Sequence, residues 1–117
     1  MEVFVGMLAK AMEDVGIRTE VFPTDGHVLI CGEISGSSTD RSLLLFDHYV
    51  VTHPGRLEDW GNLSFATVLR GNRIRARGVG DLRGQLFAYI KAIEVWRAVR
   101  GQLPTSVLPA LSGDDEI

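Results

Sequence analysis

Apolar residues recur at helical spacing in two parts of the chain. In the first part they are followed by Gly16, at the place where a left-handed residue ends a helix, so this pattern predicts a helix over residues 3–15. The apolar positions of this helix are Val5, Leu8, Met12 and Val15. The same period returns over residues 84–100 and stops at Gly101, which predicts a second, longer amphipathic helix.

Between the two helices the pattern changes to that of strands. Residues 17–21 alternate between apolar and polar, residues 23–26 break the chain, and residues 28–34 are apolar again, which predicts two strands joined by a turn. Residues 32–41 are mostly polar and are expected to form a loop. Residues 43–46 are apolar at every position, as in a strand covered on both faces, and therefore predict a central strand.

The rest of the chain completes an α/β pattern. Residues 49–64 show no period and predict a long loop. Residues 65–69 and 74–77 flank Gly71 and Asn72, a signal for a two-residue hairpin. Residues 106–112 are expected to close the fold as a strand. The order of helix, strands, helix and strand predicts the α/β class, with no internal repeat.

Composition narrows the class of protein. With 117 residues and 45% hydrophobic content, the chain suffices for one domain or a piece of one. A net charge of -3 argues against a nucleic-acid or anionic-membrane partner. The single cysteine, Cys31, lies in an apolar stretch, which favours a buried, inert thiol. The N-terminus lacks a basic signal region and no apolar run spans a membrane, so we expect a cytoplasmic location.

Candidate chemistry lies at the ends of the expected elements. His48 follows the apolar residues 43–46, Asp81 lies in a tight turn before the second helix, and an acidic cluster, residues 114–116, follows the last strand. Imidazole and carboxylate groups bind metals such as zinc, manganese and cobalt. In α/β proteins the strand ends are where such groups meet. The pattern therefore indicates a metal site.

Each candidate also has a structural explanation. His48 at a strand end is compatible with hydrogen bonding to the backbone alone. Asp81 is placed to accept amide N–H bonds as the N-cap of the long helix. Residues 114–116 are compatible with a solvated tail. His27 and His53 lie in turn-like segments without an acidic partner at a recognisable spacing, so neither is expected to bind a metal.

Four segments carry a family resemblance. They are Leu-Leu-Leu-Phe-Asp-His-Tyr-Val-Val at 43–51, Leu-Glu-Asp-Trp followed by Phe within 57–65, Arg-Gly-Val-Gly-Asp-Leu-Arg-Gly at 77–84, and Gly-Asp-Asp-Glu-Ile at 113–117. In this order and spacing they resemble the zinc-dependent amidohydrolases and peptidases that include acetylornithine deacetylase, succinyl-diaminopimelate desuccinylase, glutamate carboxypeptidase and carnosinase. The likeness covers about two thirds of the chain closely.

The resemblance implies a fold and a set of roles. Residues 1–117 would form the N-terminal portion of a three-layer catalytic domain of sheet and helices. His48 would bind one of two zinc ions, Asp81 would bridge both, and Glu116 would bind the other. Asp115 would be the catalytic base that takes a proton from the attacking water. The substrates would be amino-acid derivatives or short peptides.

The chain departs from the family pattern at several of these positions. The family's aspartate two residues after the histidine, which orients the imidazole, is Val50 here, and Asp115 stands in place of a glutamate. Asp47 replaces a glycine and Arg83 replaces a lysine. Pro109 lacks a ladder N–H, so the last strand is expected to be an edge or a distorted strand.

These departures leave two hypotheses for the function. In one, the chain is part of a metal-dependent hydrolase and is completed by further sequence or by another chain. In the other, it is a non-catalytic interaction domain that keeps the fold without the site. Val50, Asp115 and the end at Ile117, before the family's remaining ligands and lid domain, favour a chain that is inactive alone. Incompletely covered apolar faces also predict a homo-oligomer.

Overall fold

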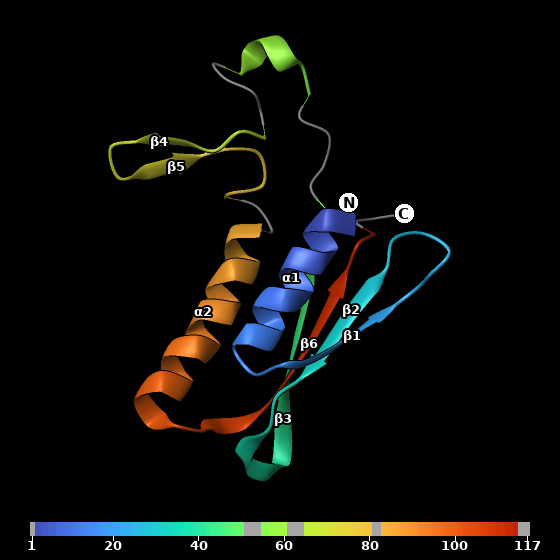
Figure 1. Ribbon diagram of the computed structural model, residues 1–117, viewed down its shortest axis with the longest axis vertical. Coiled ribbons are helices and arrows are strands. Elements are labelled where there is room, and N and C mark those ends of the chain that lie inside the picture. Colours follow the sequence, from blue (N-terminus) through green and yellow to red (C-terminus); the bar gives the residue numbers. More distant parts are fainter. Residues whose placement is uncertain (1, 51–54, 61–64, 81–82, 115–117) are drawn as a thin grey trace.

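The computed structural model describes residues 2–50, 55–60, 65–80 and 83–114. The helices are α1 (Glu2–Asp14), the short 3-10 helix η1 (Leu57–Asp59) and α2 (Arg83–Arg100). The strands are β1 (Arg18–Phe22), β2 (Leu29–Glu33), β3 (Gly36–His48), β4 (Val68–Arg70), β5 (Arg73–Arg75) and β6 (Leu103–Ser112). Figure 1 shows that β4, β5 and η1 lie beyond one end of the main sheet.

The main sheet contains four strands in the order β1-β2-β6-β3. β1 pairs antiparallel with β2, β2 antiparallel with β6, and β3 parallel with β6. The connection from β3 to β6 passes through α2, as in a βαβ unit. This mixture of helices and strands confirms the α/β class. In the described part of the chain, no helix is long and apolar enough to cross a membrane.

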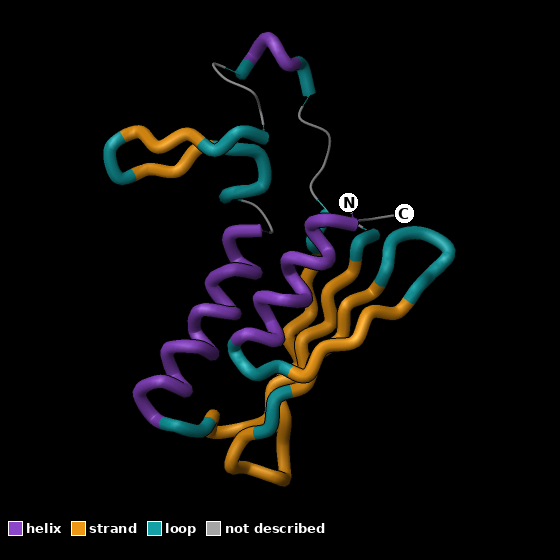
Figure 2. Tube along the Cα trace, in the orientation of Figure 1, coloured by secondary structure: helices purple, strands orange, loops and turns teal. Residues whose placement is uncertain are grey.

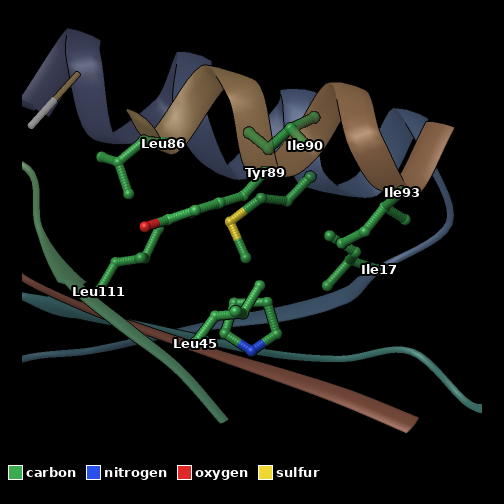
Figure 3. A pocket seen from close by; sticks show the side chains of 9 residues that line it. Ile17, Leu45, Leu86, Tyr89, Ile90, Ile93 and Leu111 are labelled. Carbon is green, nitrogen blue, oxygen red and sulfur yellow. The ribbon is translucent and has the colours of Figure 1, made fainter. Parts of the chain in front are cut away.

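Both long helices cover the same face of the sheet (Figures 1 and 2). Figure 3 shows Leu86, Ile90 and Ile93 of α2 pointing toward Leu45 and Leu111 of the sheet, around a small cavity of about 20 Å³. The buried side chains that fill this layer also include Leu8, Met12, Ile17, Ile30, Tyr49 and Val107. Burial of these apolar groups is the main source of stability for the fold.

Several predictions from the local sequence are confirmed. α1, β1, β2 and α2 lie within one or two residues of their expected ranges. Gly16 ends α1 with a φ of 93°, and Gly101 ends α2 with a φ of 80°. Gly71, with a φ of 60°, forms the turn between β4 and β5, as the hairpin signal predicted.

The prediction of a polar loop over residues 32–41 is partly wrong, because β3 begins at Gly36. Its polar start pairs with β6: Ser37 donates a hydrogen bond to the carbonyl of Pro104 at 3.2 Å, and Thr105 donates to the carbonyl of Arg41 at 2.7 Å. A Cβ added at Gly36 would lie 2.1 Å from the backbone of Thr105, so glycine allows the close approach. These partners lie more than 60 residues away, beyond the reach of a local pattern.

In the sheet that the structure describes β3 lies at the edge, which differs from the prediction of a central strand for residues 43–46. No described strand lies beyond β3. The side chains of Leu44 and Phe46, on the face opposite the helices, are 63% and 60% exposed. A continuous apolar run indicates that both faces of a strand are suited to burial. The residues that cover those faces come from other parts of a fold, so the run does not show whether they are present.

Of the two expectations for Pro109, the edge strand is wrong, because β6 lies between β2 and β3, but the distorted strand agrees with an interruption of the ladder. The ladder with β2 ends at the pair of Cys31 and Ala110 and resumes at the isolated bridge of Ile34 and Val107. A constant register places Pro109 in this gap. The central strand therefore accommodates proline where its ladder to β2 is interrupted.

Candidate metal site at the carboxyl edge of the sheet

Three elements bring their ends together at one edge of the sheet. β3 and β6 run parallel and end next to each other, since His48 is paired with Ser112, and the N–H of Tyr49 donates to the carbonyl of Ser112 at 2.9 Å. α2 begins at Arg83 at the same end (Figure 1). A crossover from strand through helix to parallel strand produces this meeting point, which is where α/β proteins bind ligands.

His48, the first predicted metal ligand, is half-buried at the end of β3. Its ring packs against the ring of Phe46 with a centroid separation of 5.2 Å and an interplanar angle of 80°. Its main-chain N–H donates to a carboxylate oxygen of Asp47 at 2.8 Å. Its ring atom Nδ1 is buried and has no hydrogen-bond partner in the described residues. The imidazole therefore packs against Phe46, and no described residue accepts or donates a hydrogen bond at its Nδ1.

Val50 stands where the family resemblance places an orienting aspartate. Its side chain is half-buried and packs against the apolar core. A valine offers no acceptor to an imidazole N–H, which agrees with the unpaired Nδ1 of His48.

Tyr49 anchors this edge in the core. Its side chain is fully buried and its hydroxyl donates to the carbonyl of Val28 at 2.7 Å. A Cβ added at Gly113 would lie 2.4 Å from the same hydroxyl, so the chain after β6 passes Tyr49 only because residue 113 is glycine. Burial raises the pKa of the Tyr49 hydroxyl above its usual value, and the negative charge of Asp114 raises it further.

The raised pKa of Tyr49 predicts a loss of stability in alkali. Below a pH of about 10 the hydroxyl is neutral in both folded and unfolded chains, so its stabilising contribution is constant. Above that pH the unfolded chain releases this proton more readily than the folded one, and the contribution falls. We expect Tyr49→Phe to lower the free energy of unfolding by about 1 kcal/mol at pH 7. The difference from the wild type should shrink above pH 10 in urea unfolding series; a difference that grows there would contradict this.

Arg83 fixes the beginning of α2. Its guanidinium lies over the ring of Phe4 of α1, 4.2 Å from the centroid, and the Phe4 ring lies 6.2 Å from the ring of Tyr49. Burial lowers the pKa of Arg83, and its Nε is buried without a partner in the described residues. Gly84 allows a tight turn, because a Cβ there would lie 2.1 Å from the carbonyl oxygen of Val79.

The other predicted site residues fall beyond what the structure describes. Asp81, Asp115 and Glu116 lie outside the described residues, so their roles stay predictions. Asp114, the described member of the acidic cluster, is exposed and accepts a hydrogen bond from the main-chain N–H of His27 at 3.2 Å. Among the described residues no three histidine, cysteine or acidic side chains form a group that could hold a metal ion.

The described atoms nevertheless fit a metal site at this edge. The two buried side-chain polar atoms without partners in the described residues are Nδ1 of His48 and Nε of Arg83. Only His48 can bind a metal, because the Nε of the Arg83 guanidinium is a hydrogen-bond donor without a free electron pair. Buried polar groups normally have partners, and exceptions point to a missing ion or ligand or to a functional role. The partner that Nδ1 of His48 lacks is the acceptor that Val50 does not provide, and the other ring nitrogen is the one that can bind a divalent metal.

Sequence reasoning missed two contacts at this edge. One is the stacking of Arg83 on Phe4, and the other is the hydrogen bond between Tyr49 and Val28. Both join residues far apart in the chain, so no local spacing in the sequence predicts them. Only the apolar character of Phe4 within a helical pattern was a usable signal.

Comparison with known proteins supports the resemblance. No protein-family model matches the chain. The succinyl-diaminopimelate desuccinylase of Nitrosospira multiformis is 30% identical over 104 residues, which cover 85% of this chain and 28% of that protein. The N-formyl-4-amino-5-aminomethyl-2-methylpyrimidine deformylase of Halalkalibacterium halodurans is 32% identical over 89 residues, 76% of this chain and 21% of that enzyme.

A solved structure supports the same resemblance. An M20 metallo-carboxypeptidase from Sulfolobus solfataricus superimposes on 96% of this chain with a TM-score of 0.86 and 25% identity. The chain is similar in fold and in sequence to the M20 metallopeptidases. It spans about a quarter of the length of that M20 structure and a similar share of the desuccinylase. The fold prediction is thereby confirmed, and the name of that M20 relative implies a metal cofactor for it.

Proposed function

We propose that this chain contributes the first part of a two-metal site to an M20 amidohydrolase or peptidase that acts on amino-acid derivatives or short peptides. The observation that carries the proposal is the buried Nδ1 of His48, which lacks a partner in the described residues and lies at the carboxyl edge of a sheet with the family's fold. The names of the relatives, a desuccinylase, a deformylase and a metallo-carboxypeptidase, support cleavage of an amide-type bond.

In this proposal each residue has one task. His48 would hold one metal, Asp81 would be shared between two metals, and Glu116 would hold the other. Bound zinc ions would supply Lewis acidity for the carbonyl and for the attacking water. Asp115 would be the general base that takes a proton from the attacking water and the general acid that delivers it to the leaving amine. Imidazole and carboxylate ligands are also compatible with manganese or cobalt.

We further propose that the chain is inactive by itself. Val50 leaves the imidazole of His48 without the carboxylate that orients it in the family pattern. The chain spans about a quarter of its relatives, so the proposed enzyme draws further ligands from elsewhere. The second candidate, a non-catalytic interaction domain, is favoured by the exposed apolar side chains of β3. A location in the cytoplasm stays a prediction.

Metal titration tests the site directly. We expect Co²⁺ or Zn²⁺ added to the purified chain to bind measurably by calorimetry. His48→Ala should weaken this binding at least about 100-fold, because losing only an outer partner of a ligand already costs about 10- to 100-fold.

His27→Ala is the matched control. His27 is an exposed histidine whose main chain, and not its ring, makes the recorded bond to Asp114, so its loss should leave metal affinity unchanged. Equal effects of the two substitutions, or no binding by the wild type, would contradict the proposed metal site. The role of a non-catalytic interaction domain would then be the better proposal.

A further inference from the structure

The turn between β1 and β2 is hydrogen-bonded to the ends of two parallel strands. The hydroxyl of Tyr49, the residue after His48 at the end of β3, donates to the carbonyl of Val28 at 2.7 Å. The neighbouring N–H of His27 donates to a carboxylate oxygen of Asp114, two residues after the end of β6, at 3.2 Å. Figure 1 shows this turn at the end of the sheet where β6 ends. Two consecutive residues of one turn therefore contact both strand ends that meet at the candidate site.

We propose that this turn positions the metal site, because it holds the end of β3 and the chain after β6 in a fixed arrangement. This role rests on the proposed function, in which His48 ends β3 and Glu116 follows Asp114 by two residues. Tyr49 and Asp114 are then positioning residues, since their side chains bond to the main chain of the turn. A metal ligand has to lie within about 0.2 Å of its preferred distance, so a looser connection between the strand ends lowers metal affinity.

The turn is ordered by hydrogen bonds of its own, and it lies outside the four segments of family resemblance. The hydroxyl of Thr24 donates to the carbonyl of His27 at 2.5 Å and accepts from the N–H of Gly26 at 3.1 Å. Hydroxyl groups that bond to nearby main-chain groups stabilise turns of this kind. Main-chain groups that are already ordered lose little conformational freedom when they bond to the strand ends. The turn is therefore suited to hold those ends in one arrangement.

Two glycines allow the turn to approach the chain after β6. A Cβ added at Gly26 would lie 2.7 Å from a carboxylate oxygen of Asp114. A Cβ added at Gly113 would lie 2.3 Å from the Cβ of His27. Both distances are shorter than a Cβ atom tolerates, so a side chain at either position would push the turn away from the end of β6. The contact between the turn and Asp114 therefore depends on glycine on both sides.

Asp114 is held at its main chain as well as at its side chain. Its N–H donates to the hydroxyl of Ser112 at 3.2 Å, and Ser112 is paired with His48 in the ladder between β3 and β6. Hydrogen bonds to a carboxylate are about twice as strong as those between neutral groups. Asp114 therefore connects the turn to the last residue of β6 and sets the direction in which the chain leaves the sheet.

Calorimetric titration of two variants at Asp114 with Zn²⁺ or Co²⁺ tests the positioning role. Asp114→Ala removes the acceptor, so we expect the dissociation constant to rise about tenfold, the smaller of the effects that follow the loss of an outer partner. Asp114→Asn keeps an acceptor oxygen at the same position and should recover most of this affinity. Equal losses in both variants would mean that the charge of Asp114 acts on the metal and that its hydrogen bond does not matter, which would overturn the inference.

Asp25→Ala is the matched control. Asp25 is an exposed acidic residue of the same turn, so its substitution removes the same charge and leaves both hydrogen bonds to the strand ends in place. We expect this variant to bind metal as the wild type does. A loss as large as that of Asp114→Ala would mean that net charge alone determines the affinity, and the positioning role would be wrong.

Amide hydrogen exchange of the metal-free chain tests the turn without a metal. The N–H of His27 should exchange on the order of tenfold faster in Asp114→Ala than in the wild type, because it loses its acceptor, and Asp114→Asn should keep most of the protection. Equal exchange in the wild type and Asp114→Ala would overturn this inference alone, and so would metal binding that Asp114→Ala leaves unchanged. A wild type that binds no metal would overturn the proposed function together with this inference.

Discussion

Val50→Asp should raise the metal affinity of the chain by about 10- to 100-fold. The substitution restores a carboxylate at the position where the family pattern has one, next to a His48 whose Nδ1 is buried and unpaired among the described residues. A carboxylate that accepts the Nδ1 proton fixes the imidazole and leaves its other nitrogen free for the metal. Outer partners of this kind typically change metal affinity by that factor. Calorimetric titration of both proteins with the same metal gives the ratio.

Val50→Asn is the matched control, because it has the same shape as aspartate but a neutral acceptor. Charge-assisted hydrogen bonds are about twice as strong as neutral ones, so asparagine should give the smaller gain. We expect no hydrolysis of N-acyl amino acids by the aspartate variant, since it adds an orienting group and no metal ligand. Turnover by this single variant would contradict the proposal that the chain is inactive alone. Equal affinities of the wild type and both variants would contradict the orienting role.

Met12→Ala should lower the free energy of unfolding by about 2–5 kcal/mol. Met12 of α1 is 1% exposed and lines the small cavity between the helices and the sheet. Truncation to alanine removes buried apolar contacts and enlarges a space that the surrounding side chains already fail to fill. Urea unfolding at one protein concentration gives the change; the concentration must be fixed because self-association adds to apparent stability.

Met7→Ala on the same helix provides the comparison. Met7 is 65% exposed, so its truncation should change the free energy of unfolding by less than about 0.5 kcal/mol. The comparison of Met12→Ala with Met7→Ala measures the effect of burial alone, because the residue type, the helix and the substitution are the same. Similar effects of the two substitutions would mean that α1 does not pack on the sheet as the structure has it.

Local chemistry made much of the fold predictable. The ends of α1 and α2 and the turn between β4 and β5 fall at Gly16, Gly101 and Gly71, which all adopt the positive φ that other residues avoid. The apolar period of each helix agrees with the residues that it buries, such as Leu8 and Ile90. These features depend on residues within a few positions of each other, so a pattern in the sequence suffices to find them.

Long-range pairing decided the features that were predicted wrongly. The polar start of β3 is a strand because β6 lies beside it, and Pro109 lies in a central strand because the ladder to β2 is interrupted there. The exposure of Leu44 and Phe46 follows from the position of β3 at the edge of the sheet. The residues of a strand do not determine which strand pairs with it or which side chains pack on its face of the sheet.

The same division applies to the candidate site. The sequence by itself determined the α/β class, the family resemblance and His48 as a candidate ligand, because imidazole and carboxylate groups at the ends of apolar strands form a local and recognisable pattern. Only the tertiary structure decided that the Nδ1 of His48 is buried without a described partner, that Arg83 stacks on Phe4, and that β3 lies at the edge of the described sheet. Burial and pairing are properties of what surrounds a residue in space, and chain neighbours alone do not define those surroundings.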